Sequence, residues 1–247
     1  ITMTKFTAFI FLFTLLLFSG CKKDSMCNCL KNTGDEISEN RYVPDFTSIE
    51  MNNNVDVVLI PDTFYSLKVI CGKNLMDGIK TEVTDNTLRI KNINKCNWLR
   101  DFENKFTVEI PLPTIEQITN NGSGNLTCAD TLKGYALQVD SWNGSGALSF
   151  LIDYQEVRFK LHTGPADIIA LGKSYDGYVY NAGNGFFKGS ELKTEYCYVI
   201  SKGTGDTEVY AAKELGATIE YQGDIYYSGD PQSILQTISG TGKLIKR

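Results

Sequence analysis

The chain has 247 residues, a formal net charge of −5 and seven cysteines. This negative charge argues against nucleic-acid binding, which needs a basic face, and against electrostatic docking on anionic lipid. The length allows one or two domains, and no stretch beyond the amino end is long and apolar enough to span a bilayer.

The amino end reads as an export signal rather than as part of the fold. Lys5 precedes an apolar run over residues 6–18, and small residues follow it, as in a secretory signal. Phe18-Ser19-Gly20-Cys21 resembles a bacterial lipobox, which implies that Cys21 carries lipid; an ordinary secretory signal is the alternative. We expect a signal peptide over residues 1–20 and a lipid anchor with a flexible tether over residues 21–41. The protein would then be an outer-membrane lipoprotein, on either the periplasmic or the surface-exposed side.

Six cysteines follow Cys21, and an exported chain can form disulfides. Cys27 and Cys29 are too close to bridge each other easily, so we expect this pair, through Cys29, to bond to Cys96 and tie the tether to the body. Cys128 and Cys197 lie in apolar strand patterns and are expected to be buried thiols. The sequence predicts no metal site and no cofactor, because the spacing of Cys27 and Cys29 is not that of zinc ligands and no histidine is near.

The body begins near Tyr42 with short strands. Apolar patterning predicts strands over residues 46–51, 55–60, 65–71, 81–84, 87–91 and 106–110, of which the first and the last alternate apolar and polar residues and residues 55–60 form a nearly continuous apolar run. One short helical turn is expected over residues 75–79. Asp85 and Asn86 form a tight turn between two of these strands. No helical period extends beyond two turns, which indicates an all-β chain.

A turn built on glycine recurs about every 20 residues after Ile118, most clearly as Asn121-Gly122-Ser123-Gly124 and Asn143-Gly144-Ser145-Gly146. We expect glycine at these corners because it reaches positive φ at no steric cost. The turn glycines are Gly122, Gly124, Gly144, Gly146, Gly164, Gly203, Gly205, Gly240 and Gly242. Near Gly164 and near Gly223 one glycine of the motif is missing, so we expect a different backbone conformation in those turns.

A fixed period of this length is typical of repeat proteins, in which each unit buries its apolar face against its neighbours. We therefore predict a single-domain parallel β-solenoid over residues 42–247, with the Gly-x-Gly turns aligned along one edge. A β-sandwich of hairpins is the alternative, because many short strands with regular turns fit that fold as well.

These segments also resemble a known family. The opening strand Phe46-Thr47-Ser48-Ile49, the segment Val55-Asp56-Val57, residues 74–79 before Leu88-Arg89-Ile90, and the Gly-Ser-Gly turns are similar to the putative auto-transporter adhesin family with its head GIN domain. The resemblance covers about residues 42–245. It implies a bacterial envelope protein with a parallel β-helical body, and it brings no catalytic residues with it.

Candidate site residues are few. His162 is the one histidine, and without a Gly-x-Ser-x-Gly elbow we interpret it as an outward strand residue. Gly203-Thr204-Gly205-Asp206 is similar to calcium-binding Gly-Asp repeats, but its period is about twice theirs. Acids that neighbouring turns could pair for glycosidase chemistry are Asp140, Asp153, Asp167, Asp176, Asp206 and Asp224. Aromatic residues crowd the second half, either as packing or as an outer ladder for a partner.

Two function classes follow from these observations. The favoured hypothesis is an envelope-anchored, non-catalytic, adhesin-like binding protein with an unknown protein or glycan partner on an exposed face, because long rigid solenoids suit extended contacts. The alternative is a carbohydrate-active enzyme, a polysaccharide lyase or glycosidase, built on a β-helix.

Overall fold

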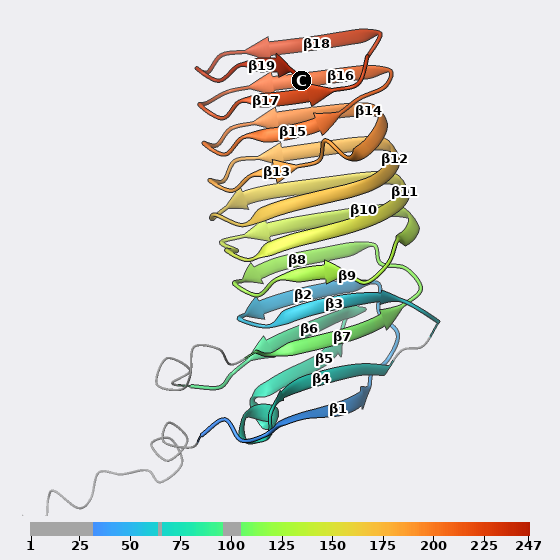
Figure 1. Ribbon diagram of the computed structural model, residues 1–247, viewed down its shortest axis with the longest axis vertical. Helices are drawn as coiled ribbons and strands as arrows, with labels where there is room; N and C mark the ends of the chain where they lie inside the picture. Colours follow the sequence, from blue (N-terminus) through green and yellow to red (C-terminus); the bar gives the residue numbers. More distant parts are fainter. Residues whose placement is uncertain (1–31, 64–65, 96–104) are drawn as a thin grey trace, which may run out of the picture.

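Strands from successive turns of the chain pair in parallel, so the sheet winds into a solenoid whose axis is vertical in Figure 1. This computed structural model describes residues 32–63, 66–95 and 105–247. The predicted parallel β-solenoid is confirmed, and the β-sandwich is wrong because hydrogen-bonded neighbours are equivalent strands of consecutive turns rather than hairpin partners.

Each turn of the solenoid, or rung, has one strand on each side of the glycine corner. Before the corner the chain runs through β8 (Gln117–Gly122), β10 (Leu132–Trp142), the second halves of β11 (Ala147–Thr163) and β12 (Asp167–Asn181), then β14 (Leu192–Ser201), β16 (Glu214–Ile219) and β18 (Ser233–Ile238). After it come β9 (Leu126–Cys128), the first halves of β11 and β12, β13 (Phe187–Lys188), β15 (Thr207–Tyr210), β17 (Ile225–Ser228) and β19 (Leu244–Lys246). Figure 1 shows these two stacks rising side by side.

The chain does not climb the axis in order at its amino-terminal end. The rung of β2 (Ser48–Asn53) and β3 (Asp56–Pro61) lies between the β8–β9 rung and a later rung made of β6 (Thr87–Asn92) and β7 (Thr107–Leu112). The chain therefore leaves this rung, descends toward the lower end in Figure 1, and comes back past it. Repeat spacing does not reveal this insertion, because the strands that pair are far apart in sequence.

Antiparallel strands close the lower end. β1 (Glu36–Tyr42) pairs with β4 (Ser66–Gly72), and β5 (Ile79–Thr84) pairs with β6 across Asp85 and Asn86, which both have positive φ. The 3-10 helix η1 (Lys73–Gly78) lies where the short helical turn was predicted. Among the described residues, no helix is long and apolar enough to cross a membrane.

The expectation of a tether as far as residue 41 is wrong for its last part, because β1 belongs to the sheet. Its side chains are almost all exposed, so the stretch carries no apolar pattern by which a strand could be recognised. Backbone pairing with β4 holds it, together with Arg41, whose Nη1 donates a hydrogen bond of 2.6 Å to the carbonyl oxygen of Ile79.

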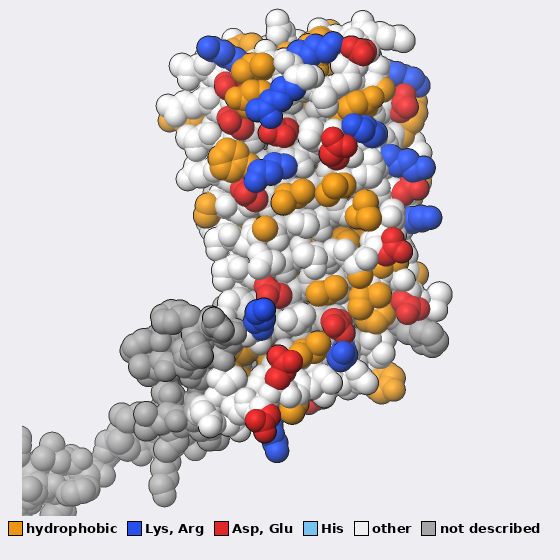
Figure 2. Space-filling view, viewed as in Figure 1, with side chains coloured by type: hydrophobic (Ala, Val, Ile, Leu, Met, Phe, Trp, Pro, Cys, Tyr) orange, Lys and Arg blue, Asp and Glu red, His pale blue; other side chains and the backbone are white. Residues whose placement is uncertain are grey.

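A continuous apolar core fills the solenoid. Inward and outward side chains alternate along the strands, and the inward side chains of equivalent positions stack from rung to rung. Part of this core consists of three phenylalanine rings. The ring centroid of Phe159 lies 5.5 Å from that of Phe150 and 5.3 Å from that of Phe187. On the outer surface of the view in Figure 2, acidic and basic side chains are interspersed, without a large patch of one sign.

The carboxyl-terminal end differs from the lower end, since β18 and β19 have no described rung beyond them (Figure 1). Ile234 and Ile238 continue the inward columns of Leu215 and Ile219, yet they are 40% and 46% exposed. The described residues therefore cover these two inward side chains only in part.

Candidate functional site

The predicted turn glycines stack in two columns along one edge of the solenoid. A β-carbon on Gly146 would lie 2.0 Å from the carbonyl oxygen of Gly124, and one on Gly205 would lie 1.8 Å from that of Gly185. The other column follows the first glycine of each motif and contains Gly122, Gly144, Gly164, Gly203 and Gly240. Gly242, like Gly223, continues the column of Gly124.

The physical reason given for these glycines needs correction. Of the predicted set only Gly164 has positive φ, at 90°, so conformational freedom explains just one position. At most of the other positions glycine is required because the backbones of successive rungs approach too closely for a side chain, whereas a β-carbon on Gly144 would meet the side chain of Asn120 at 2.3 Å. In the turn that contains Gly164, Ala166 occupies the position of the missing second glycine and is fully buried. This rung therefore leaves room for one methyl group.

Acidic and amide side chains beside these turns bind the backbone of the next rung. The carboxylate of Asp206 accepts a hydrogen bond of 2.9 Å from the amide of Asp224, and Asp224 accepts one of 2.7 Å from the amide of Lys243. Asp56, Asn125 and Asp167 do the same at lower rungs. The Gly-Thr-Gly-Asp motif thus joins rungs, and the described residues contain no group of three or more His, Cys, Asp or Glu arranged to hold a metal.

The outward side of β10, β11, β12 and β14 carries a different set of side chains, which we name the β10–β14 face. Two register columns form its centre, namely Gln138, Arg158, Tyr178 and Tyr198, and beside them Asp140, Lys160, Tyr180 and Ile200; the neighbouring outward residues of these strands belong to it as well. Alternate residues of the same strands, such as Val139, Phe159 and Val199, are buried in the core. The sheet therefore fixes the backbone position from which each outward side chain projects.

Asp140 and His162, one repeat apart, form a pair on this face. His162 Nε2 lies 2.8 Å from Asp140 Oδ1, and Gln138 Nε2 donates a hydrogen bond of 2.6 Å to Asp140 Oδ2. The imidazole stacks on Trp142 with ring centroids 3.7 Å apart and an interplanar angle of 5°. The hydrogen bonds of Gln138 and His162 to Asp140 hold the imidazole on which Trp142 stacks, and Trp142 itself is 47% exposed.

Sequence reasoning placed His162 correctly as an outward residue but missed this pair. A usable signal existed, because both residues occupy outward strand positions separated by one period of 22 residues. Tyr180 adds a third aromatic ring, 5.6 Å from the imidazole centroid.

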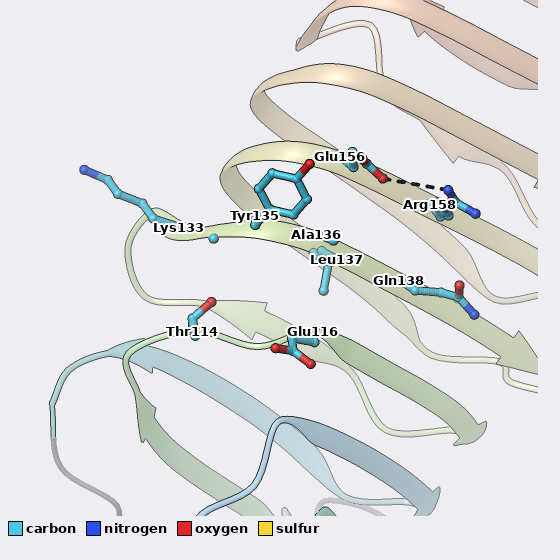
Figure 3. A pocket seen from close by; sticks show the side chains of 10 residues that line it. Thr114, Glu116, Lys133, Tyr135, Ala136, Leu137, Gln138, Glu156 and Arg158 are labelled. Carbon is cyan, nitrogen blue, oxygen red and sulfur yellow. Dashed lines mark ion pairs between the residues drawn. The ribbon is translucent and has the colours of Figure 1, made fainter.

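A groove crosses the β10–β14 face, and Figure 3 shows the first of its two parts. One part has a volume of ≈560 Å³ and lies between the end of β7 and β11; in the close-up, Glu116, Gln138 and Tyr135 project around it. The next part, of ≈520 Å³, continues toward β14. Both parts share Glu156 and Arg158, which form an ion pair at 3.7 Å. The groove thus runs along the solenoid axis.

Of the six acids proposed for glycosidase chemistry, Asp140 and Asp176 belong to this face. The others have structural partners: Asp153 pairs with Lys173, Asp167 with Lys188, and Asp206 and Asp224 with backbone amides. The structure therefore does not gather the six carboxylates into one site.

The aromatic residues of the second half divide between both predicted roles. Phe187 belongs to the core. Tyr175 and Tyr196 pack across neighbouring strands, with centroids 5.3 Å apart, and Lys213 Nζ lies 5.7 Å from each ring. Tyr178 and Tyr198 line the groove.

Cysteine chemistry does not contribute to the face. Cys71 and Cys197 are buried free thiols and Cys128 is a half-buried one. Burial raises the pKa of the Cys71 thiol to about 11 and that of Cys128 to about 11, so both stay protonated at neutral pH. The predicted lipid site at Cys21 and the predicted Cys29–Cys96 disulfide lie outside the described residues.

Fold and face together define a β-solenoid protein with a groove along one face of its sheet. The chain belongs to the family described as putative auto-transporter adhesin, head GIN domain, which it matches over residues 45–231. The predicted family resemblance is thereby confirmed. A comparison with curated proteins found no match.

Solved structures show the same fold. A crystal structure described as a putative adhesin from Bacteroides fragilis has a TM-score of 0.78 and 20% identity, covering 86% of this chain and 97% of that one. One described as a putative lipid binding protein from Parabacteroides distasonis has a TM-score of 0.66 and 22% identity, covering 87% and 98%. A putative adhesin from Parabacteroides merdae has a TM-score of 0.66 and 17% identity, covering 88% and 98%.

Proposed function

We propose that this chain is a non-catalytic binding protein of the bacterial cell envelope that contacts its ligand through the β10–β14 face. The observation that carries the proposal is the face itself, where aromatic and charged side chains project from a rigid sheet. Its family and two of its structural neighbours are described as adhesins, which supports a binding role.

The arrangement of acids supports binding rather than catalysis. A glycosidase needs two carboxyl groups facing one bond, with one of them able to donate a proton. Here Asp140 accepts hydrogen bonds from two neighbours and Glu156 pairs with Arg158. The described carboxylates beside the glycine turns bind backbone amides.

Anchoring is the second part of the proposal. We propose that lipid on Cys21 holds the protein on the outer membrane, with the solenoid standing away from the surface. The lipobox-like segment before Cys21 supports this. Lipid chains stabilise membrane attachment by about 0.8 kcal/mol for each buried CH₂ group.

Two measurements test the proposal. The wild-type chain is expected in the membrane fraction and Cys21→Ser in the soluble fraction; membrane retention of Cys21→Ser would refute anchoring. For binding, the purified Cys21→Ser chain is incubated with intact bacterial and host cells, with and without Trp142→Ala plus Tyr178→Ala. Retention on cells that these changes reduce supports the face, whereas retention that they leave unchanged removes it as the contact surface.

A further inference from the structure

We propose that the axial groove of the β10–β14 face binds a linear, uncharged glycan chain lying along the solenoid axis. This inference rests on the proposed function and specifies its ligand. The groove offers the length, the aromatic surface, the polar groups and the charge balance that such a ligand requires, and the strands beneath it offer no free edge to an extended peptide.

The length of the groove fits a chain rather than a small molecule. It extends from Glu116, beside β8, to Tyr198 on β14, and so crosses five neighbouring strands. Strands in a sheet are about 4.8 Å apart, so the groove is about 19 Å long. Both parts share Glu156 and Arg158, so the two parts adjoin along the axis.

Aromatic side chains occur along this channel at more than one rung. Tyr178 and Tyr198 are register partners on adjacent strands, and Tyr135 at the other part is 72% exposed. Tyrosine offers a flat apolar ring with a polar tip, which suits the C–H surface and the hydroxyl groups of a sugar ring. Tyr198 is held in place by a hydrogen bond of 2.7 Å from its hydroxyl to Glu214.

Polar groups lie side by side between the aromatic rings. The Glu156–Arg158 ion pair presents an acceptor and donors side by side, and Gln138 is fixed by its hydrogen bond to Asp140. Neighbouring hydroxyl groups of a sugar need such adjacent donors and acceptors. Orientation before binding lowers the entropy lost when the ligand binds.

The charge of the groove indicates an uncharged ligand. Three basic side chains, Lys133, Arg158 and Lys160, face three acidic ones, Glu116, Glu156 and Asp176, so the formal charges sum to zero. A polyanionic glycan would meet as many repulsive as attractive charges. Since complementary potential governs which charged partners are accepted, this groove has no preference for either sign.

Two common features by which proteins bind peptides, a free strand edge and a continuous apolar groove for a helix, do not describe this site. An extended peptide binds a sheet by adding a strand to a free edge. Within the face, β11 pairs with β10 on one side and β12 on the other, and β12 pairs with β11 and β14, so their backbone groups are occupied. A helical ligand needs a continuous apolar groove, whereas charged side chains such as Lys133, Glu156 and Arg158 interrupt this one.

Isotope-edited NMR titration of the full chain carrying Cys21→Ser tests the inference. The probes are uncharged linear gluco-, manno- and xylo-oligosaccharides of increasing length, with polygalacturonate and a proline-rich peptide as competitors of other chemistry. We expect at least one uncharged series to shift amide signals of β10, β11 and β12, with affinity that rises with chain length and changes little with salt.

Matched variants locate the site. Tyr178→Ala with Tyr198→Ala is expected to weaken binding at least about tenfold, as truncation of contact aromatics commonly does. Tyr226→Ala, on β17 of the other stack, serves as the control and is expected to leave affinity unchanged. Unperturbed core amide signals show that each variant is folded.

Preferential binding of polygalacturonate or of the peptide, or failure of every uncharged series, would overturn the inference. Equal weakening by Tyr226→Ala would also overturn it. The proposed function fails by a different result, namely cell retention that is insensitive to the face variants, so the two failures are distinguishable.

Discussion

The carboxylate of Asp206 accepts a hydrogen bond from the backbone amide of Asp224, the residue at the equivalent place one rung further along the solenoid. Asp224 in turn accepts from Lys243, so a chain of such bonds follows the turn edge. A buried or half-buried amide that loses its acceptor destabilises the fold, because water no longer replaces the bond fully.

We therefore expect Asp206→Ala to lower the free energy of unfolding by about 1 kcal/mol, whereas Asp206→Asn keeps an acceptor oxygen and costs less than about 0.5 kcal/mol. Urea denaturation followed by circular dichroism measures both. If added calcium stabilised the wild-type chain but not Asp206→Ala, the carboxylate would be a metal ligand instead of a link between rungs.

Gly146 and Gly124 give the second prediction. Since a β-carbon on Gly146 would lie 2.0 Å from the carbonyl oxygen of Gly124, the rungs must separate to admit Gly146→Ala. We expect a loss of about 2–3 kcal/mol, in the range of overpacked cores. Gly177→Ala is the control, because its nearest contact is a side-chain methyl of Thr194 at 2.9 Å and it should cost clearly less. Equal losses would show that close approach is not the reason for glycine at the turns.

These two sites show how far the sequence predicts this fold. The regular spacing of the turns predicts the solenoid, and the turn glycines lie on one edge as that spacing indicates. The reason for glycine is not visible in a sequence, because the close contact joins residues of different rungs. The insertion of β2 and β3 between later rungs is hidden for the same reason. β1 is hidden because backbone pairing, not an apolar pattern, holds it.

The site was less predictable than the fold. Asp140 and His162 are ordinary outward residues in the sequence, and only the stacking of rungs brings them to 2.8 Å. Tyr178 and Tyr198 stood out as part of an aromatic-rich stretch, but sequence alone does not separate groove residues from packing pairs such as Tyr175 and Tyr196.

The position of Trp142 yields a third prediction. His162→Ala removes the ring on which Trp142 stacks, so the indole should become more solvated and more mobile. We expect a red shift and lower anisotropy of its fluorescence, measured with Trp98→Phe as background because Trp98 is the other tryptophan. Asp140→Ala should give a smaller change in the same direction, since it frees the imidazole without removing it. An unchanged spectrum in both variants would show that the stack does not position Trp142.

Stability should fall at alkaline pH, in part because of Cys71. Burial raises the pKa of this thiol from 9.0 to about 11. Between these values the folded state holds the proton more tightly than the unfolded state, so the stabilisation is fully present below pH 9 and is lost as pH rises toward 11. Cys71→Val should weaken the pH dependence of the unfolding free energy over this range by an amount on the order of 1 kcal/mol. A steeper dependence in Cys71→Val would contradict the assignment.

The partly exposed inward side chains of β18 give the last prediction. Ile219 and Ile238 are register partners on adjacent strands, but Ile219 is fully buried and Ile238 is 46% exposed. Burying a lysine without a partner costs several kcal/mol, whereas a half-exposed one can extend into water. We expect Ile219→Lys to cost more than about 3 kcal/mol and Ile238→Lys less than about 1 kcal/mol. Hydrogen exchange should agree: β18 amides should exchange at least about a hundredfold faster than those of β11, because local opening concentrates where few contacts hold a strand. Equal protection of β18 and β11, together with a large cost for Ile238→Lys, would mean that this end is covered in solution.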